Sequence, residues 1–343
     1  MPQRTILVTG GAGFIGSNFV DYLFRKYPNY HIIVLDALTY AGSPDNIAED
    51  IKKSNRYEFW YGNVTNDDLV NQLVTRCDTV VHFAAESHVA RSIFDNKIFY
   101  VTDVLGTQAV ANAVVRNKDI DRFIHISTSE VYGTAMSNPM TEDHLLNPLS
   151  PYASAKAGAD RLVYSYYASY HIPACIVRPF NQYGPKQHLE KVIPRFITSA
   201  LLGEPLTVHG TGYAKRDWLY VEDTCKRLDL IMHAPLEKIR GEAINLGSGF
   251  DLDVISIAEM VLDILGKPKD LITHIGDRPG QVAHHISSTS KAEDLLGIEP
   301  PRSFQSGLEQ TIEWYTKNRP WWEKLLWMRH VPIMTESGKV EYH

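Results

Sequence analysis

A tyrosine and a lysine four residues apart form the segment of this sequence best suited to chemistry. In Tyr152-Ala-Ser-Ala-Lys156, both side chains fall on one face of a helix, because residues i and i+4 are neighbours on a helix surface. The Lys156 ammonium group is expected to lower the pKa of the Tyr152 phenol, so that Tyr152 can act as a base near neutral pH. The pair therefore predicts removal of a proton from an alcohol.

A hydroxyl and a carboxylate are predicted beside this tyrosine. The stretch Ser127-Thr-Ser-Glu-Val-Tyr-Gly133 follows an apolar run, and Thr128 and Glu130 alternate along what we expect to be a strand end. Alternate residues of a strand point to the same side. Simple dehydrogenation of an alcohol needs no carboxylate, whereas an enzyme that also removes a carbon-bound proton does. The stretch therefore favours a second proton abstraction, with Glu130 as its base.

The N-terminal segment predicts a dinucleotide site. An apolar strand at 5–9 runs into a glycine-rich turn, a helix is expected at 17–26, and a second strand at 31–35 ends at Asp36. Glycines permit a tight turn and close approach of the backbone to a pyrophosphate, which the N-terminus of the helix then faces. The turn residues expected to bind cofactor are Gly10, Gly13, Phe14, Ile15 and Gly16.

Asp36 indicates which dinucleotide is bound. It lies about 20 residues after the turn, the spacing expected for a carboxylate that binds a ribose diol. Ala37, Leu38 and Thr39 follow, so a 2′-phosphate would meet a negative charge with no neighbouring arginine. We therefore predict NAD rather than NADP. The alternative is a glycine turn in an unrelated α/β protein, but strand, turn, helix, strand and acid occur here in order.

Composition excludes several classes of protein. The 343 residues are 44% hydrophobic and 22% charged with a net charge of −6, and the charges are interspersed, so neither nucleic acid nor an anionic membrane is an expected partner. No apolar run approaches the roughly 20 residues that span a bilayer. Three widely spaced cysteines favour a reducing cytoplasm. His125 and His284-His285 lack ligand-spaced partners, so we predict no metal.

The pattern along the chain predicts a Rossmann-type, doubly wound parallel sheet with a smaller, mixed C-terminal lobe. Strand and helix alternate over 1–180, the expected NAD-binding domain, with helices at about 100–115 and 151–170. Segments within about 215–250, including strands at 217–221 and 243–246, are expected to return to the first sheet. We assign 181–214 and 251–330 to a substrate-binding lobe, with a helix at 256–266. The tail, 331–343, has no assignment.

Several stretches together resemble the extended short-chain dehydrogenase/reductase family, and within it the nucleotide-sugar 4,6-dehydratases, with the dTDP-glucose dehydratases as the nearest group. The similarity covers nearly the whole chain. The stretches that carry it are Asp36-Ala-Leu-Thr-Tyr-Ala-Gly42, Ala84-Ala-Glu-Ser-His-Val-Ala-Arg-Ser92, Ser150-Pro-Tyr-Ala-Ser-Ala-Lys156, Asn181-Gln-Tyr-Gly-Pro185, Glu190-Lys-Val-Ile-Pro194 and Arg216-Asp-Trp-Leu-Tyr-Val-Glu-Asp223.

The resemblance implies a reaction and roles for residues. Tyr152, helped by Lys156 and Thr128, would take the proton of a sugar 4-hydroxyl; NAD would take the C4 hydride; Glu130 would remove the C5 proton, water would leave from C6, and the hydride would return to C6. Further cofactor contacts would come from Asn63, Val64, Ala84 and Ala85. The nucleotide-diphosphate sugar would meet Ser87, His88, Asn181, Lys191, Arg216, Asn245 and Arg278.

Three positions depart from the pattern of the resembling group. Ser129 stands where dTDP-glucose dehydratases usually carry an aspartate that protonates the departing 6-hydroxyl, and serine is far too weak an acid for that work. Thr-Ser-Glu resembles GDP-mannose dehydratases and UDP-glucuronate decarboxylases instead. Asp103 stands where relatives usually have asparagine, and Ala90 where dTDP-glucose enzymes often have aspartate. Ser129 leaves the nucleotide and the sugar open.

Other functions on the same scaffold are a sugar 4-epimerase, a UDP-glucuronate decarboxylase, or a non-catalytic NAD sensor. Epimerases do not need Glu130, many decarboxylases carry a stretch before the tyrosine that is absent here, and sensors typically lose the Tyr-Lys pair. The resemblance also implies a homodimer built through a four-helix bundle, with the helices at about 98–116 and 151–170 from each subunit.

Overall fold

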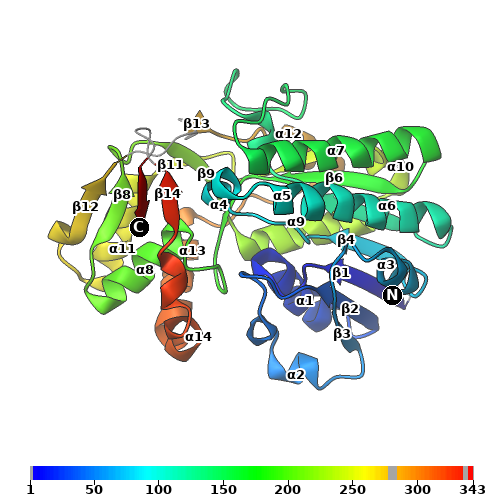
Figure 1. Ribbon diagram of the computed structural model, residues 1–343, viewed down its shortest axis with the longest axis horizontal. Coiled ribbons are helices and arrows are strands. Elements are labelled where there is room, and N and C mark those ends of the chain that lie inside the picture. The colour runs from blue at the N-terminus through cyan, green and yellow to red at the C-terminus, as the bar shows by residue number, and fades with distance from the viewer. Residues whose placement is uncertain (1–2, 277–283, 335–338, 343) are drawn as a thin grey trace.

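A seven-stranded parallel sheet forms one part of the computed structural model, which describes residues 3–276, 284–334 and 339–342 (Figure 1). The strand order is β10-β6-β5-β4-β1-β2-β3. The strands are β1 (Arg4–Thr9), β2 (Tyr30–Asp36), β3 (Tyr57–Tyr61), β4 (Thr79–His82), β5 (Arg122–Ile126), β6 (Ala174–Pro179) and β10 (Ala243–Leu246). The order reverses between β1 and β4, and ligands of such sheets bind at the carboxyl ends of the strands beside that point. The predicted fold class is confirmed.

Helices cover both faces of this sheet. On one face, α1 (Phe14–Lys26) and α9 (Val221–His233) pack apolar side chains against the strands. The other face is covered by α3 (Asp67–Val74), α6 (Thr107–Arg116) and α7 (Pro151–Tyr170). In β1, Ile6 belongs to the first core and Leu7 to the second. Burial on both faces explains why the strands are continuous apolar runs rather than alternating ones.

Helix α7 begins and ends where the sequence predicts. The Ser150 hydroxyl accepts a hydrogen bond from the Ala153 N–H at 3.1 Å, and Pro151 occupies the first turn, where its missing N–H has no helical partner to lose. This cap fixes the first two turns of α7, which carry Tyr152 and Lys156.

The helix predicted at about 100–115 is a composite. It consists of α5 (Lys97–Phe99), a π-helix (Tyr100–Gly106) and α6. Within the described residues, Lys97–Arg116 is the one helix whose length and composition would allow a membrane crossing, but 56% of its most apolar window is buried inside the fold. A buried core helix meets the same criterion, so this finding does not point to a membrane.

A second, smaller lobe packs beside the main sheet (Figure 1). Its core is formed by α8 (Val192–Leu202), α11 (Val254–Leu265) and α13 (Phe304–Lys317), followed by α14 (Arg319–Glu323). Its strands are β7 (Asn181–Tyr183), β8 (Leu206–His209), β9 (Lys215–Tyr220), β11 (Asp251–Asp253), β12 (Ile272–Ile275) and β13 (His284–His285).

One expectation about these strands is wrong. The segment predicted at 217–221 forms β9, which pairs with β7, β11 and β13 rather than with the first sheet, whereas β10 does return to it. All three partner strands belong to the second lobe. Two alternate residues of β9, Trp218 and Tyr220, pack into the apolar core of that lobe. The shorter helices are α2 (Glu49–Lys52), α4 (Val89–Phe94), α10 (Leu236–Ile239) and α12 (Ser290–Leu296), and β14 (Pro332–Met334) pairs with β15 (Val340–Tyr342).

Candidate active site

A cavity of about 580 Å³ lies at the carboxyl ends of the main strands and is lined by residues of both lobes. The glycine turn after β1 closes one end. The segments that follow β4 and β5, together with the start of α7, form the middle. The walls on the other side come from 179–196 and 207–218 of the second lobe. The cavity therefore brings together segments from most of the chain.

The glycine turn fits a closely approaching dinucleotide. Gly10 has φ +69°, and a Cβ there would lie 2.6 Å from the Ala84 backbone nitrogen; a Cβ on Gly16 would lie 2.3 Å from the Gly10 carbonyl oxygen. Only glycine permits this packing of the turn against the start of α1. The cofactor candidates Gly10, Gly13, Phe14, Ile15 and Gly16 all line the cavity.

The next strands supply the remaining cofactor candidates. Asp36, at the end of β2, lines the cavity, and its carboxylate accepts backbone N–H groups from Ala12 at 2.9 Å and Leu38 at 2.8 Å. Burial raises the pKa of Asp36, and these two hydrogen bonds lower it. The fixed carboxylate sits where a ribose diol is expected. Asn63, Val64, Ala84 and Ala85 line the same end of the cavity. These residues fit NAD.

Tyr152 and Lys156 face the cavity from α7, and both are almost completely buried. Burial raises the pKa of Tyr152, while a hydrogen bond with Thr128 lowers it. Lys156 donates a hydrogen bond from Nζ to the Ile126 carbonyl oxygen at 2.7 Å. In this arrangement desolvation of the phenol outweighs the hydrogen bond from Thr128 that favours its ionised form. The expected effect of Lys156 on the pKa of Tyr152 stays a prediction.

Thr128, Ser129 and Glu130 also line the cavity, but their backbone differs from the expected strand end. Strand β5 ends at Ile126, and Ser129–Tyr132 form a 3₁₀ turn capped by Thr128, whose hydroxyl accepts the Glu130 N–H at 3.2 Å. The tight turn, rather than strand alternation, presents the hydroxyl and carboxylate beside Tyr152. Ser129 is 2% exposed and lines the cavity with a hydroxyl in the place of the missing acid.

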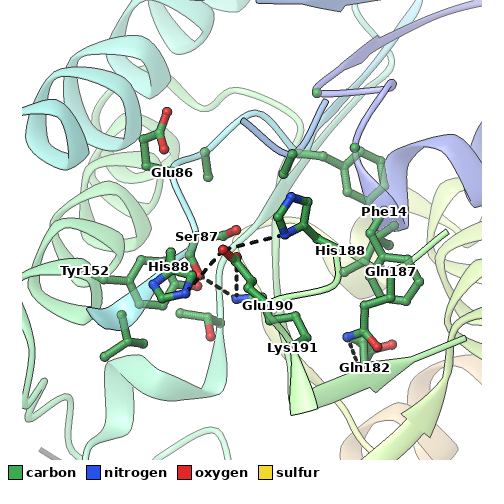
Figure 2. A pocket seen from close by; sticks show the side chains of 18 of the residues that line it. Phe14, Glu86, Ser87, His88, Tyr152, Gln182, Gln187, His188, Glu190 and Lys191 are labelled. Carbon is green, nitrogen blue, oxygen red and sulfur yellow. Dashed lines mark hydrogen bonds and ion pairs between the residues drawn. The ribbon is translucent and has the colours of Figure 1, made fainter. Parts of the chain in front are cut away.

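A buried carboxylate surrounded by basic side chains also lines the cavity. Glu190 Oε2 is 3.2 Å from His88 Nε2, and Glu190 Oε1 is 3.6 Å from Lys191 Nζ. Figure 2 shows His88, His188 and Lys191 arranged around this carboxylate. Burial raises the pKa of Glu190, against the attraction of Lys191 and Arg91. Lys191 also donates to the Ser87 carbonyl oxygen at 3.1 Å, which ties two predicted substrate residues together.

The other substrate candidates differ in their placement. Asn181 and Arg216 line the cavity with Ser87, His88 and Lys191. Asn245 does not, and this placement corrects its proposed role. Its Oδ1 accepts the Tyr132 hydroxyl at 2.7 Å and its Nδ2 donates to the Met140 carbonyl oxygen at 3.0 Å, so the amide is used up inside the core. Arg278 lies outside the described residues.

Glu86 follows β4 with Ser87 and His88, in the segment where the sequence predicts contact with substrate hydroxyls. It lines the cavity, and burial raises the pKa of its carboxyl. One feature of the cavity is absent from the sequence predictions. Val331, from the tail that had no assignment, lines it and packs against Ala90, while Met328 Sδ lies 2.8 Å from His188 Nε2. Glu190 stands inside a quoted motif and could have been singled out as an acid; nothing in the tail signals the position of Val331. No cluster of potential metal ligands occurs in the part of the chain that the structure describes.

Comparison with known proteins identifies the family. The family model described as GDP-mannose 4,6 dehydratase matches residues 7–311. The chain belongs to this family. It is 45% identical over 90% of its length to the low-salt glycan biosynthesis protein Agl12 of Haloferax volcanii, of which it covers 98%, and 40% identical over 93% to a dTDP-glucose 4,6-dehydratase of Streptomyces niveus, of which it covers 95%.

Solved structures give the same family and one neighbouring activity. DesIV, a dTDP-glucose 4,6-dehydratase of Streptomyces venezuelae solved with NAD bound, superimposes with a TM-score of 0.89 at 39% identity, covering 94% of this chain and 99% of that one. A UDP-glucuronic acid 4-epimerase of Bacillus cereus, in complex with UDP-glucuronic acid and NAD, matches with a TM-score of 0.86 at 32% identity, covering 91% and 99%. The predicted resemblance to nucleotide-sugar 4,6-dehydratases is confirmed.

Proposed function

We propose that this protein is an NAD-dependent nucleotide-sugar 4,6-dehydratase, a lyase that converts a nucleotide-diphosphate hexose into its 4-keto-6-deoxy derivative. One observation carries the proposal: Glu130 lines the same cavity as Tyr152, Lys156 and the glycine turn. The pair and the turn serve any sugar oxidation on this scaffold. A second base beside them is needed only where a carbon-bound proton is removed.

The cofactor would be held by the glycine turn, Asp36 and the segments at 63–64 and 84–85. Bound there, NAD would supply the redox chemistry, as the acceptor of the C4 hydride and the donor of the hydride to C6. Tyr152, polarised by Thr128 and Lys156, takes the proton of the 4-hydroxyl. Glu130 removes the C5 proton, which the neighbouring ketone has made acidic, exchanges it with solvent, and later delivers a proton to C5. The departing 6-hydroxyl needs one proton, and the 4-hydroxyl has released one, so the reaction loses one water overall.

Ser129 limits how that last proton is delivered. A serine hydroxyl can hold the 6-hydroxyl by a hydrogen bond, but its pKa is far too high for proton donation. The proton therefore comes from a group other than residue 129. Glu86 and Glu190 both line the cavity, and burial raises the pKa of each, so both keep a proton more readily than an exposed carboxyl.

Substrate charge and assembly belong to the same proposal. Lys191 and Arg216 stand in the cavity wall, where cationic side chains suit a diphosphate.

A homodimer through a four-helix bundle is supported by apolar side chains left exposed on the two relevant helices: Ile98, Tyr100, Leu105, Tyr164 and Tyr170. Three free, buried cysteines support a reducing, cytoplasmic location. We retain the proposed division into an NAD-binding domain at 1–180 and a substrate lobe, with the returning segments reduced to α9 and β10 and with β9 moved to the substrate lobe.

The test is to incubate the purified protein with dTDP-glucose, UDP-glucose, GDP-mannose, UDP-N-acetylglucosamine and UDP-glucuronate, in deuterated water, and to weigh the products. Loss of one water with deuterium at C5 from one substrate is the expected result. Loss of carbon dioxide, or unchanged mass with altered chromatography, would instead indicate the decarboxylase or the epimerase.

Replacement of the second base tests the observation that carries the proposal. Glu130→Gln should lower dehydration by about 10²- to 10⁴-fold, the usual contribution of a positioned base, and should abolish deuterium entry at C5. Glu299→Gln, an exposed carboxylate outside the cavity, is the matched control and should behave as wild type. Normal dehydration by Glu130→Gln would remove Glu130 from the mechanism.

A further inference from the structure

A buried carboxylate beside the catalytic pair has no place in the mechanism so far. Asp103, in the π-helix, is 1% exposed. Its Oδ1 accepts the Glu86 backbone N–H at 2.8 Å. Its Oδ2 is buried and has no hydrogen-bond partner among the described residues. Burial of a carboxylate with one oxygen left without a hydrogen bond destabilises the fold unless a nearby positive charge compensates it.

The compensating charge is Lys156. The π-helix packs against α7, where Phe99, Tyr152 and Ala155 form one apolar cluster, and the Asp103 carboxylate attracts the Lys156 ammonium group. Lys156 is 3% exposed. Burial lowers the pKa of Lys156, and the attraction of Asp103 and Asp160 raises it.

Asp160 is already matched by another cation. Its two carboxylate oxygens accept hydrogen bonds from Arg178 at 2.9 and 3.0 Å, and the Ser127 hydroxyl donates a third at 2.7 Å. Asp103 has no such cation in direct contact within the described residues. Asp103 is therefore the stronger of the two negative charges that act on Lys156, and Asp160 is the weaker one.

We propose that Asp103 is a positioning residue of the catalytic site, whose carboxylate balances Lys156 inside the protein and thereby sets how readily Tyr152 gives up its proton. The proposal rests on the proposed function for its kinetic meaning. Two other titratable groups face Asp103: the neutral phenol of Tyr152 from α7 and the carboxyl of Glu86 from the segment after β4. His82 reaches it indirectly, through the Thr107 hydroxyl that donates to the Asp103 carbonyl oxygen at 2.5 Å.

The sign of the effect follows from the charges. Burial raises the pKa of Asp103 to about 7, against the attraction of Lys156. Above that pH Asp103 is ionised and disfavours the tyrosinate form of Tyr152, because two negative charges would share a buried site. An asparagine would keep the acceptor for the Glu86 N–H and remove the charge. Lys156 would retain its proton through the Ile126 carbonyl oxygen and Asp160, so the net charge beside Tyr152 would become more positive. The pKa of Tyr152 should then fall.

The experiment compares Asp103→Asn with wild type across pH. The acidic limb of kcat/KM for the sugar nucleotide should move to lower pH by on the order of one unit, the size of a single nearby charge. Asp119→Asn, an exposed carboxylate beyond α6, is the control and should leave the profile unmoved. Asp103→Ala, which also loses the Glu86 hydrogen bond, separates the role of the charge from that of the acceptor.

A second readout needs no substrate turnover. Tyrosine labelled with ¹³C at Cζ, with the Tyr152 signal assigned from Tyr152→Phe, reports the phenol directly in the presence of NAD. We expect the Cζ signal of Tyr152 to move downfield as the phenol ionises, and this titration to begin at lower pH in Asp103→Asn than in wild type. Superimposable titrations and superimposable pH profiles would overturn the proposal, as would a uniform loss of activity at every pH. If wild type dehydrates none of the sugars, the proposed function fails while the titration still tests Asp103.

Discussion

Gly10 offers a sharp test of why the cofactor turn is built from glycine. Gly10 and Gly203 share nearly the same backbone, with φ +69° and +72°, but differ in their surroundings. A Cβ on Gly10 would lie 2.6 Å from the Ala84 nitrogen and 2.9 Å from the Phe83 carbonyl carbon, whereas a Cβ on Gly203 would meet nothing within 4 Å. Gly203 caps α8 and does not line the cavity, so it is a matched control.

The two alanine variants separate backbone strain from close approach. In Gly203→Ala, a left-handed alanine costs about 1–2 kcal/mol and restriction of the unfolded chain returns about 0.4–1 kcal/mol, leaving a loss near 1 kcal/mol. Gly10→Ala has the same terms plus overpacking against rigid backbone, about 1–3 kcal/mol more. If the turn shifts to relieve that contact at a cost of about 1.4 kcal/mol, NAD binding weakens about tenfold.

Urea unfolding and calorimetric titration with NAD measure both quantities. We expect Gly10→Ala to lose more stability than Gly203→Ala and to bind NAD at least about tenfold more weakly, while Gly203→Ala binds as wild type. Equal losses of stability, or normal NAD binding by Gly10→Ala, would show that the close approach to Ala84 has no consequence.

Two further predictions follow from other parts of the fold. Val331→Ala should raise KM for the sugar nucleotide by about threefold to tenfold with kcat nearly unchanged, because the variant leaves a gap beside Ala90 worth about 1 kcal/mol; steady-state kinetics measures this, and an unchanged KM would exclude contact of that wall with substrate. Burial alone would raise the pKa of Asp229, but hydrogen bonds from His233, Lys26 and Tyr27 lower it to about 2. A carboxyl with a lowered pKa stabilises the fold above its ordinary pKa near 4, and this stability is lost as pH falls toward 2. Asp229→Asn should therefore cost about 1 kcal/mol at pH 7, since the half-exposed Lys26 is screened by solvent, and clearly less at pH 2, where part of the carboxyl is protonated in the folded state; an equal loss at both values would contradict this assignment.

The sequence predicts the cofactor end of the site best, for physical reasons. The glycine turn, the first strands and Asp36 are contiguous, and each is dictated by local backbone geometry. Helix α7 is equally local, since Ser150 and Pro151 mark its start. These elements could be predicted because their signals lie within about 20 residues of one another.

The remainder depends on tertiary packing that no local pattern reports. The π-helix that carries Asp103 has the periodicity of an ordinary helix, and the pKa of Tyr152 depends on burial by distant segments. Asn245 has a polar side chain that could bind substrate, but it is buried in the core and bonded to Tyr132 and Met140. The sequence around Asn245 does not reveal these partners, because both lie more than 100 positions earlier in the chain. Strand β9 has the pattern of a buried strand, which does not say which sheet it joins.

Val331 lines the cavity and Met328 contacts His188 in its wall, and these late residues set an order of events during synthesis. The glycine turn, Asp36 and the catalytic candidates Thr128, Glu130, Tyr152 and Lys156 all lie before residue 160, so those groups leave the ribosome early. The contact of Val331 with Ala90 and that of Met328 with His188 can form only after the last part of the chain has been synthesised. A growing polypeptide would thus carry a dinucleotide cleft long before it carries a closed sugar compartment, and a messenger cut short near its end would yield a protein able to hold cofactor yet unable to enclose a hexose.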